Sequence, residues 1–198
     1  HEYDVQQQRA QWQVLQQVTA SDVTIGIMGL GVLGEAAAAI LTRMNYRVTG
    51  WSRSRKNIAG VRSYVGESEL LEFLNDVHIL VMLLPYNETT QHILNKETLA
   101  QLPRGATVIN AGRGGCVHET DLLNALDKGH ISGAALDVFE AEPLPGGHLF
   151  WQHPNVTLTP HAASLTNPVS AVEFVAENIR RHQNGKRLKH KVQPTDRR

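Results

Sequence analysis

Cysteine is almost absent from this 198-residue sequence, in which Cys116 is the only one. A lone thiol excludes an internal disulfide and fits a reducing compartment. Neither charge is in excess, because lysine plus arginine and aspartate plus glutamate each number 19, so no overall field favours nucleic acid or an anionic membrane. No apolar run approaches the roughly 20 residues that span a bilayer, and the glutamine-rich start excludes a signal peptide. These absences indicate a soluble, cytoplasmic globular protein that binds neither nucleic acid nor membrane.

The length suits one domain that folds around its own core without disulfides or metal. Ahead of that domain, residues 2–18 have a loose helical pattern, which predicts either an ordinary surface helix or frayed end, or a linker or dimer-contact helix. Residues 186–198 form a basic tail that we expect to be solvated and partly disordered. The sequence therefore predicts a linker helix in residues 1–20, a nucleotide-binding domain in residues 21–185 and a tail.

Between these ends, short β-branched runs alternate with helical patterns. We expect strands over residues 23–28, 46–51, 78–84, 106–110, 132–138 and 156–159, and helices over residues 35–44, 67–75, 96–102, 119–128 and 169–184. Strands that alternate with helices are typical of an α/β fold with a doubly wound parallel sheet. The predicted fold is a Rossmann-type dinucleotide-binding domain.

A glycine-rich turn follows the first expected strand and matches the dinucleotide fingerprint. Gly29 permits the tight turn, Gly31 lets a pyrophosphate approach the backbone, and Gly34 lets the helix pack close to the strand. The start of that helix offers unpaired N–H groups to phosphates. The predicted phosphate-binding residues are Gly29, Gly31, Val32, Leu33 and Gly34.

The end of the second expected strand indicates which nucleotide is bound. Enzymes that use NAD place an acidic residue there for the ribose 2′-hydroxyl, whereas this sequence has Ser52, Arg53, Ser54 and Arg55. Arginine can bind a 2′-phosphate, and a charged hydrogen bond contributes roughly 1.5–3 kcal/mol. The sequence therefore predicts NADP(H) as cofactor; the alternative is that these are solvated loop cations.

Three chemically versatile side chains follow later strands. Arg113 comes after residues 106–110, Glu142 after residues 132–138, and His161 after residues 156–159. Because ligands of open α/β sheets bind beyond the carboxyl ends of the strands, these three could converge. The alternatives are an exposed loop cation, a solvated acid and a surface histidine, and Glu140 could take the place of Glu142.

Together these segments resemble the cofactor domain of the D-2-hydroxyacid dehydrogenases, most closely NADPH-dependent glyoxylate/hydroxypyruvate reductases of bacteria. The resemblance implies that Arg113 holds the substrate's carbonyl and carboxylate oxygens, that His161 is the acid–base group, and that Glu142 pairs with His161. It also places Asp137 on the nicotinamide carboxamide. The same resemblance assigns cofactor contacts to Leu84, Pro85 and Ala111.

The resemblance implies NADPH-dependent reduction of a small 2-keto acid, glyoxylate or hydroxypyruvate, to the D-2-hydroxy acid by a homodimer, with no metal. A substrate domain of about 100 residues or more would precede the fingerprint, and this chain largely lacks it, so we expect a fragment with poor activity of its own. One rival is a non-catalytic NAD(P)(H)-binding module such as a corepressor-like sensor. Another is a β-hydroxyacid or 6-phosphogluconate-type dehydrogenase, which would need a lysine on a separate helical domain.

Overall fold

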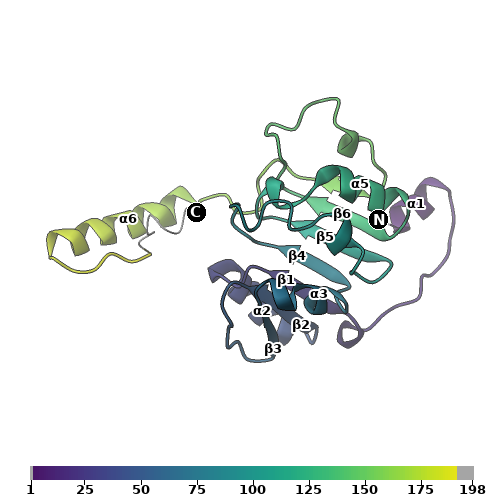
Figure 1. Ribbon diagram of the computed structural model, residues 1–198. Coiled ribbons are helices and arrows are strands. Elements are labelled where there is room, and N and C mark those ends of the chain that lie inside the picture. Colours follow the sequence, from purple (N-terminus) through teal and green to yellow (C-terminus); the bar gives the residue numbers. More distant parts are fainter. Residues whose placement is uncertain (1, 191–198) are drawn as a thin grey trace. The chain divides into compact units, whose positions relative to one another are not determined.

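The computed structural model describes residues 2–190, and its centre is a parallel sheet of seven strands in the order β3-β2-β1-β4-β5-β6-β7 (Figure 1). The strands are β1 (Thr24–Met28), β2 (Arg47–Ser52), β3 (Val61–Val65), β4 (Ile79–Met82), β5 (Ala106–Asn110), β6 (Ile131–Leu136) and β7 (Val156–Leu158). The chain returns to β1's other side when it makes β4, so the strand order reverses between these two strands. The expected doubly wound α/β fold is confirmed.

The helices between the strands are short. They are α1 (Glu2–Gln8), α2 (Val32–Arg43), α3 (Leu70–Leu74), α4 (Lys96–Leu99), α5 (Glu119–Asp127) and α6 (Pro168–Gln183), with 3-10 turns η1 (Ala20–Asp22), η2 (Glu67–Glu69), η3 (Gly114–Cys116) and η4 (Leu149–Trp151). The chain forms two compact units, residues 1–160 with the whole sheet and residues 161–198 with α6. None of the helices within residues 2–190 is both long and apolar enough to cross a membrane.

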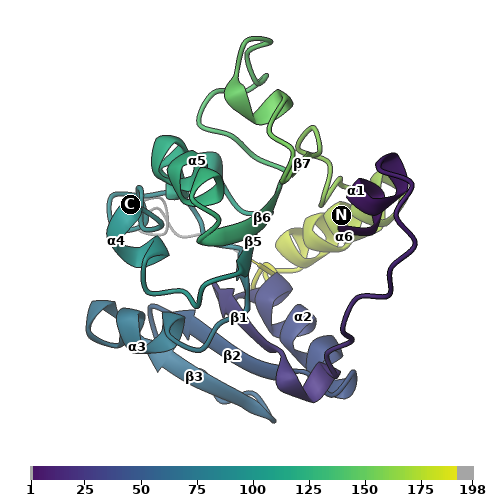
Figure 2. The same ribbon diagram turned by 90° about the vertical axis from the view of Figure 1, so that its right-hand side faces the viewer.

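Helices α2 and α3 cover opposite faces of the sheet, as Figure 2 shows. A Cβ built on Gly34 of α2 would lie 3.5 Å from the side chain of Ile27, whereas one built on the neighbouring strand position Gly26 would lie 2.9 Å from Phe73 of α3. Successive strand residues point to opposite faces, so each face has its own core. The smaller core holds Ile25, Ile27, Leu30, Ala38 and Val48, and the larger extends from Met28 to Phe150.

Strand β3 is the one strand that the sequence analysis missed. It pairs with β2 alone, from Val48 opposite Val61 to Ser52 opposite Val65. An edge strand of a parallel sheet keeps one side open, and here polar Arg62 and Ser63 interrupt the apolar positions. No apolar run of the length typical of a buried strand was therefore present to predict it.

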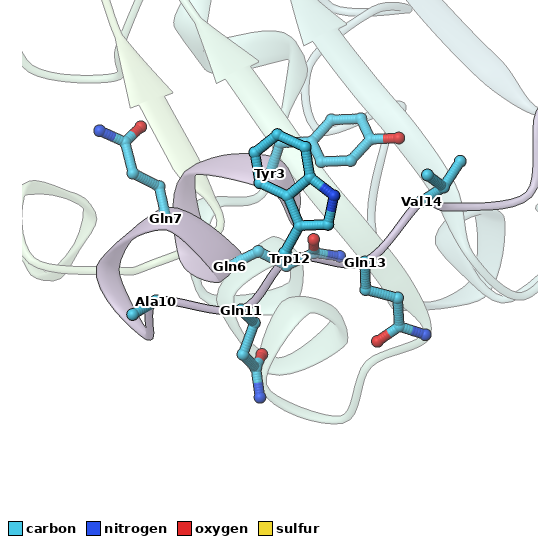
Figure 3. Close-up of a pocket in the computed structure, with 8 residues that line it drawn as sticks. All are labelled: Tyr3, Gln6, Gln7, Ala10, Gln11, Trp12, Gln13 and Val14. Atoms are coloured by element: carbon cyan, nitrogen blue, oxygen red, sulfur yellow. The ribbon is translucent and has the colours of Figure 1, made fainter.

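The N-terminal helix ends earlier than the expected residue 18. The Gln11 N–H donates to the Gln6 carbonyl at 2.8 Å and the Ala10 N–H to the Gln7 carbonyl at 3.1 Å, while Ala10 has φ 52°. This is a Schellman ending with alanine at the position that glycine usually occupies. The sequence therefore contained no stop signal. Residues of α1 and of the segment that follows it to Val14 line a pocket of 510 Å³, and the fully exposed Trp12 is among them (Figure 3).

The second unit begins with a loop and continues as α6. Asn167 caps the helix by accepting from the N–H of Val169 at 2.9 Å, and Pro168 occupies the first turn, which agrees with a start expected near residue 169. Of the predicted basic tail, residues 186–190 are exposed, and Lys189 is paired through its backbone with the side chain of Asn178. Residues 191–198 of that tail lie outside the described residues.

The only cysteine is a structural residue in the larger core. Cys116 is 1% exposed, and its thiol donates to the Pro85 carbonyl at 3.8 Å. Burial raises the pKa of this thiol, so the thiolate that reacts with alkylating agents is scarce. We expect iodoacetamide at neutral pH to leave Cys116 largely unmodified in the folded protein and to modify it fully in denaturant, as intact mass spectrometry would measure. Rapid modification under native conditions would contradict this burial.

Candidate active site

The fingerprint glycines hold the start of α2 tightly against the end of β1. Gly29 has φ 106°, and its N–H donates to the Trp51 carbonyl at 2.8 Å. A Cβ on Gly29 would lie 2.7 Å from the Leu83 carbonyl oxygen, and one on Gly34 would collide with the Gly29 carbonyl oxygen. The roles expected for these two glycines, a tight turn and close helix packing, match this geometry.

Gly31 is the N-cap of α2 and leaves the end of the helix open. A Cβ built there would meet no atom within 4 Å, and glycine has no side chain that could bond to the N–H groups of the first turn. Val32 and Leu33, the next residues, are 74% and 58% exposed. The N–H groups and the positive dipole end of a twelve-residue helix can therefore receive a phosphate that approaches across Gly31.

The cationic segment at the end of β2 divides into residues with different surroundings. The hydroxyl of the buried Ser52 donates to the Ser54 carbonyl at 2.8 Å, which folds the segment into a turn. Arg53 and Ser54 are exposed. Within residues 2–190, Arg53 forms neither a hydrogen bond nor an ion pair, so its guanidinium is available to an anion.

Arg55, by contrast, is anchored on the missed strand β3. Its guanidinium donates to the Ser63 carbonyl at 2.6 Å and to Glu69 Oε1 at 2.5 Å, and Glu69 Oε2 accepts from the Val65 N–H at 2.8 Å. Glu69 was not singled out from the sequence, because its role depends on β3. Arg53 is therefore the arginine best placed to bind a ligand here, and Arg55 stiffens the segment that carries it.

The ends of β4 and β5 lie against each other beside this turn. The Leu83 N–H donates to the Met28 carbonyl at 2.8 Å, and the Ala111 N–H donates to the Met82 carbonyl at 3.2 Å. Leu84 is buried, whereas Pro85 is exposed at the start of its loop. These contacts extend the sheet's hydrogen bonding past the strands, so the predicted cofactor residues Leu84, Pro85 and Ala111 lie on the same edge as the fingerprint.

Asn110, the last residue of β5, holds the backbone on both sides of Arg113. Its side chain is 1% exposed, donates to the Arg113 carbonyl at 3.1 Å and accepts from the Gly112 N–H at 3.1 Å. The Arg113 side chain is exposed, and one of its five N–H groups donates to the Gly112 carbonyl at 2.6 Å. A buried asparagine with both ends bonded leaves little freedom for this loop. The sequence analysis missed Asn110, although a polar residue that ends a buried strand was a usable signal.

The Arg113 loop abuts the loop that carries Glu142. A Cβ on Gly114 would overlap the carbonyl carbon of Phe139, so the two backbones are in contact. The Phe139 N–H in turn donates to Glu142 Oε1 at 3.0 Å, which bends Glu142 back toward the end of β6. Glu140 instead pairs with His92, at 2.8 Å from Nε2 to Oε1. The two carboxylates therefore have different partners, and the choice of Glu142 over Glu140 stays a prediction.

Asp137 and His161 complete the predicted set. Asp137 is 5% exposed, accepts from the Thr159 hydroxyl at 2.5 Å and donates its N–H to the Asn110 carbonyl at 3.0 Å. His161 lies just past Leu158, the end of β7, with an exposed side chain and φ 52°. It is the first residue of the second unit, so its pairing with Glu142 stays a prediction.

The carboxyl edge of the sheet thus collects, within residues 1–160, every predicted site residue except His161. The fingerprint turn lies at the end of β1, where the strand order reverses toward β4. In open α/β sheets a ligand binds in the crevice at such a reversal. The arrangement provides an open helix end, a cationic segment and, two strands away from β1, an arginine loop in backbone contact with the loop that carries Glu142.

Comparison with known proteins agrees with this geometry. The family model described as D-isomer specific 2-hydroxyacid dehydrogenase, NAD binding domain, matches residues 1–163. A D-isomer specific 2-hydroxyacid dehydrogenase of Xanthobacter autotrophicus Py2, crystallised with NADPH and MES, is 42% identical with a TM-score of 0.96. The match covers 100% of this chain and 81% of that protein's chain. An NADPH-dependent glyoxylate/hydroxypyruvate reductase of Sinorhizobium meliloti, crystallised with NADP and sulfate, is 41% identical with a TM-score of 0.95.

This chain spans 64% of the length of that reductase. A probable 2-hydroxyacid dehydrogenase of Rhizobium etli CFN 42, crystallised with NADP, HEPES and L(+)-tartaric acid, is 38% identical with a TM-score of 0.93. That match covers 100% of this chain and 63% of the Rhizobium chain. The family model matches more than half of this chain, and the three solved structures share its fold. The chain therefore belongs to the D-isomer specific 2-hydroxyacid dehydrogenase family and contains that family's NAD binding domain.

Proposed function

We propose that this chain is the cofactor-binding portion of an NADPH-dependent reductase that converts a small 2-keto acid, glyoxylate or hydroxypyruvate, to the D-2-hydroxy acid. The observation that carries the proposal is the contact between the Arg113 and Glu142 loops, through Gly114 and Phe139, at the edge that holds the fingerprint turn. The similarity to a reductase of this kind at 41% identity supports the substrate class.

The proposed chemistry divides between the cofactor and three side chains. NADPH, when bound, supplies the hydride. The Arg113 guanidinium binds the keto acid's oxygens in a forked geometry and polarises the carbonyl. His161 donates the proton to the carbonyl oxygen, and the Glu142 carboxylate orients that histidine. Asp137 accepts a hydrogen bond from the carboxamide of the nicotinamide.

The residues present fit a dinucleotide with a 2′-phosphate. The open backbone at Gly31 and the first turn of α2, with Val32 and Leu33, would hold the pyrophosphate. Arg53 would bind the 2′-phosphate, with Ser52, Ser54 and Arg55 shaping its segment. Sequence positions 52–56 contain no carboxylate that would repel the phosphate. Leu84, Pro85 and Ala111 would line the nicotinamide side.

We predict that Arg53→Ala weakens NADPH binding about 10–100-fold and leaves NADH binding nearly unchanged. The reason is that Arg53 is expected to bind the 2′-phosphate, which NADH lacks. Calorimetric titration with both nucleotides at one fixed ionic strength measures the two affinities. A fixed ionic strength is needed because the attraction between Arg53 and the phosphate is screened by salt.

The matched control is Arg43→Ala, which removes an equally exposed cation at the other end of α2 and should leave the affinity for both nucleotides unchanged. NADH binding to the unsubstituted chain as tightly as NADPH would show that the cofactor assignment is wrong. An equal loss for both nucleotides in Arg53→Ala would mean that Arg53 supports the fold of the turn rather than the 2′-phosphate.

Turnover by the complete protein separates this function from a non-catalytic sensor. We expect NADPH oxidation with glyoxylate or hydroxypyruvate, followed by absorbance, and the D-enantiomer as the product of a chiral keto acid. Tight NADPH binding without turnover would favour the sensor. We further propose that residues 21–185 form the nucleotide-binding domain, that residues 1–20 contribute to a homodimer contact, and that the protein acts in the cytoplasm.

A further inference from the structure

The connection from β6 to β7 carries Glu142 and arches beyond the sheet, where Figure 1 shows it in green above α5. Its residues 145–147 are exposed, and a Cβ built on either Gly146 or Gly147 would meet no atom within 4 Å. Glycines of this kind leave a loop with much conformational freedom. The Phe139 N–H holds the Glu142 side chain on one side, so the contacts that hold the rest of this connection decide how firmly Glu142 is placed.

The carboxylate of Glu119, in the first turn of α5, bonds to two residues of this connection that lie on either side of the glycines. Its Oε1 accepts from the Glu140 N–H at 3.0 Å, and its Oε2 lies 3.1 Å from His148 Nε2. The side chains of Glu119 and His148 are only 16% and 22% exposed, so water competes weakly for these bonds. One carboxylate thus closes the loop of residues 140–148 at its base.

The hydrogen bonds also assign the tautomer of His148. Its Nδ1 accepts from the Phe150 N–H at 3.2 Å, which caps η4. The proton of the neutral ring is therefore on Nε2 and is donated to Glu119. Both partners of Glu119, the Glu140 N–H and the His148 Nε2–H, are donors, so only a carboxylate can satisfy them together.

A second contact ties the same loop end to the Arg113 segment. Glu140 Oε1 pairs with His92 Nε2 at 2.8 Å, and the His92 N–H donates to the Gly115 carbonyl at 2.9 Å. The loop end that Glu119 holds is thus also connected to the loop of Arg113.

We propose that Glu119 and His148 form a clasp that positions Glu142 relative to Arg113, and that both are positioning residues of the reaction; this inference rests on the proposed reductase function. Neither residue is one of the groups proposed to contact the keto acid or the nicotinamide. Their effect is on the placement of Glu142, and a misplacement of the order of 1 Å can cost about 100-fold in rate.

The test compares two substitutions of one residue in the complete protein. His148→Gln keeps a side-chain N–H where Nε2–H was and so keeps the clasp, whereas His148→Asn keeps an acceptor for the Phe150 N–H and loses the clasp. We expect His148→Asn to lower kcat about 10–100-fold and His148→Gln to retain most of it. Glu119→Gln, which can accept from only one of the two donors, should lower kcat like His148→Asn. NADPH affinity should be unchanged in all three.

Hydrogen exchange of the amides of residues 140 and 148, which donate to Glu119 and to the Pro145 carbonyl, is the second measurement, and it does not depend on activity. Exchange should rise in His148→Asn and Glu119→Gln and stay close to the unsubstituted protein in His148→Gln. Equal kcat in the Asn and Gln variants, or unchanged kcat with raised exchange, would overturn the inference. An unsubstituted protein that binds NADPH but turns over no 2-keto acid would instead overturn the proposed function.

Discussion

Replacing Arg113 by alanine is expected to lower kcat/KM of the complete protein about 100–1,000-fold while leaving NADPH affinity nearly unchanged. Arg113 is the predicted substrate cation, and its backbone is fixed on both sides by one buried side chain, that of Asn110. Its guanidinium is exposed on the carboxyl edge of the sheet and can polarise a carbonyl where negative charge develops in the transition state. Steady-state kinetics with the 2-keto acid and nucleotide titration provide the two measurements.

Arg113→Lys and Arg104→Ala are the controls for this prediction. Lysine keeps the charge but loses the forked donor pair, so we expect an intermediate loss of kcat/KM. Arg104 is an exposed cation just before β5, at the opposite end of that strand from Arg113, and its removal should not change the kinetics. Activity of Arg113→Ala equal to that of Arg104→Ala would remove Arg113 from the mechanism.

Replacing Gly114 by alanine is expected to lower the free energy of unfolding by about 1–3 kcal/mol or more. The added Cβ would overlap the backbone of Phe139, and backbone atoms cannot rotate away as a side chain can. Relief of the overlap requires the loops of Arg113 and Glu142 to separate. Activity should therefore fall together with stability, and urea unfolding measures the stability change.

Gly146→Ala is the matched control for the stability measurement. This glycine lies in the same β6–β7 connection, and its Cβ would meet no atom within 4 Å, so we expect a change within about 0.5 kcal/mol. Unfolding curves that coincide for the Gly114 and Gly146 variants would show that the contact between the two loops is loose. The argument that these loops form one unit would then be wrong.

Much of the fold was predictable from the sequence because each signal was local. The strands β1, β5 and β7 lie within one residue of their expected bounds, since β-branched runs between turn residues mark strands regardless of their neighbours. The fingerprint turn was predictable from the spacing of its glycines between a strand and a helix, although the atom that excludes a side chain at Gly29 belongs to Leu83, beyond the end of β4. Arg113 and Glu142 were predictable from their places after strands together with the family resemblance.

Most of the missed features depend on partners that are distant in the sequence, and the early end of α1 is a local exception. Strand β3 exists because β2 offers an edge, and the anchoring of Arg55 on Glu69 follows from β3. The expected helix to residue 18 was wrong because Ala10 adopts a left-handed conformation that its identity does not signal. The different partners of the two carboxylates, Phe139 for Glu142 and His92 for Glu140, became visible only in the structure, and the choice of Glu142 stays a prediction.

The sequence by itself determined the class of fold, the nucleotide turn and the order of the chemically active segments along the chain. Periodicity and turn chemistry are properties of a few adjacent residues, and they need no knowledge of the rest of the chain. Only the tertiary structure decided that Asn110 braces Arg113, that Glu119 joins Glu140 to His148, and that Arg53 stays available while Arg55 is anchored. The contacts of Glu119 and Arg55 are hydrogen bonds between segments that meet only after the sheet has formed, and their geometry is set by packing rather than by sequence distance. Those of Asn110 lie within three residues and depend on the buried end of β5.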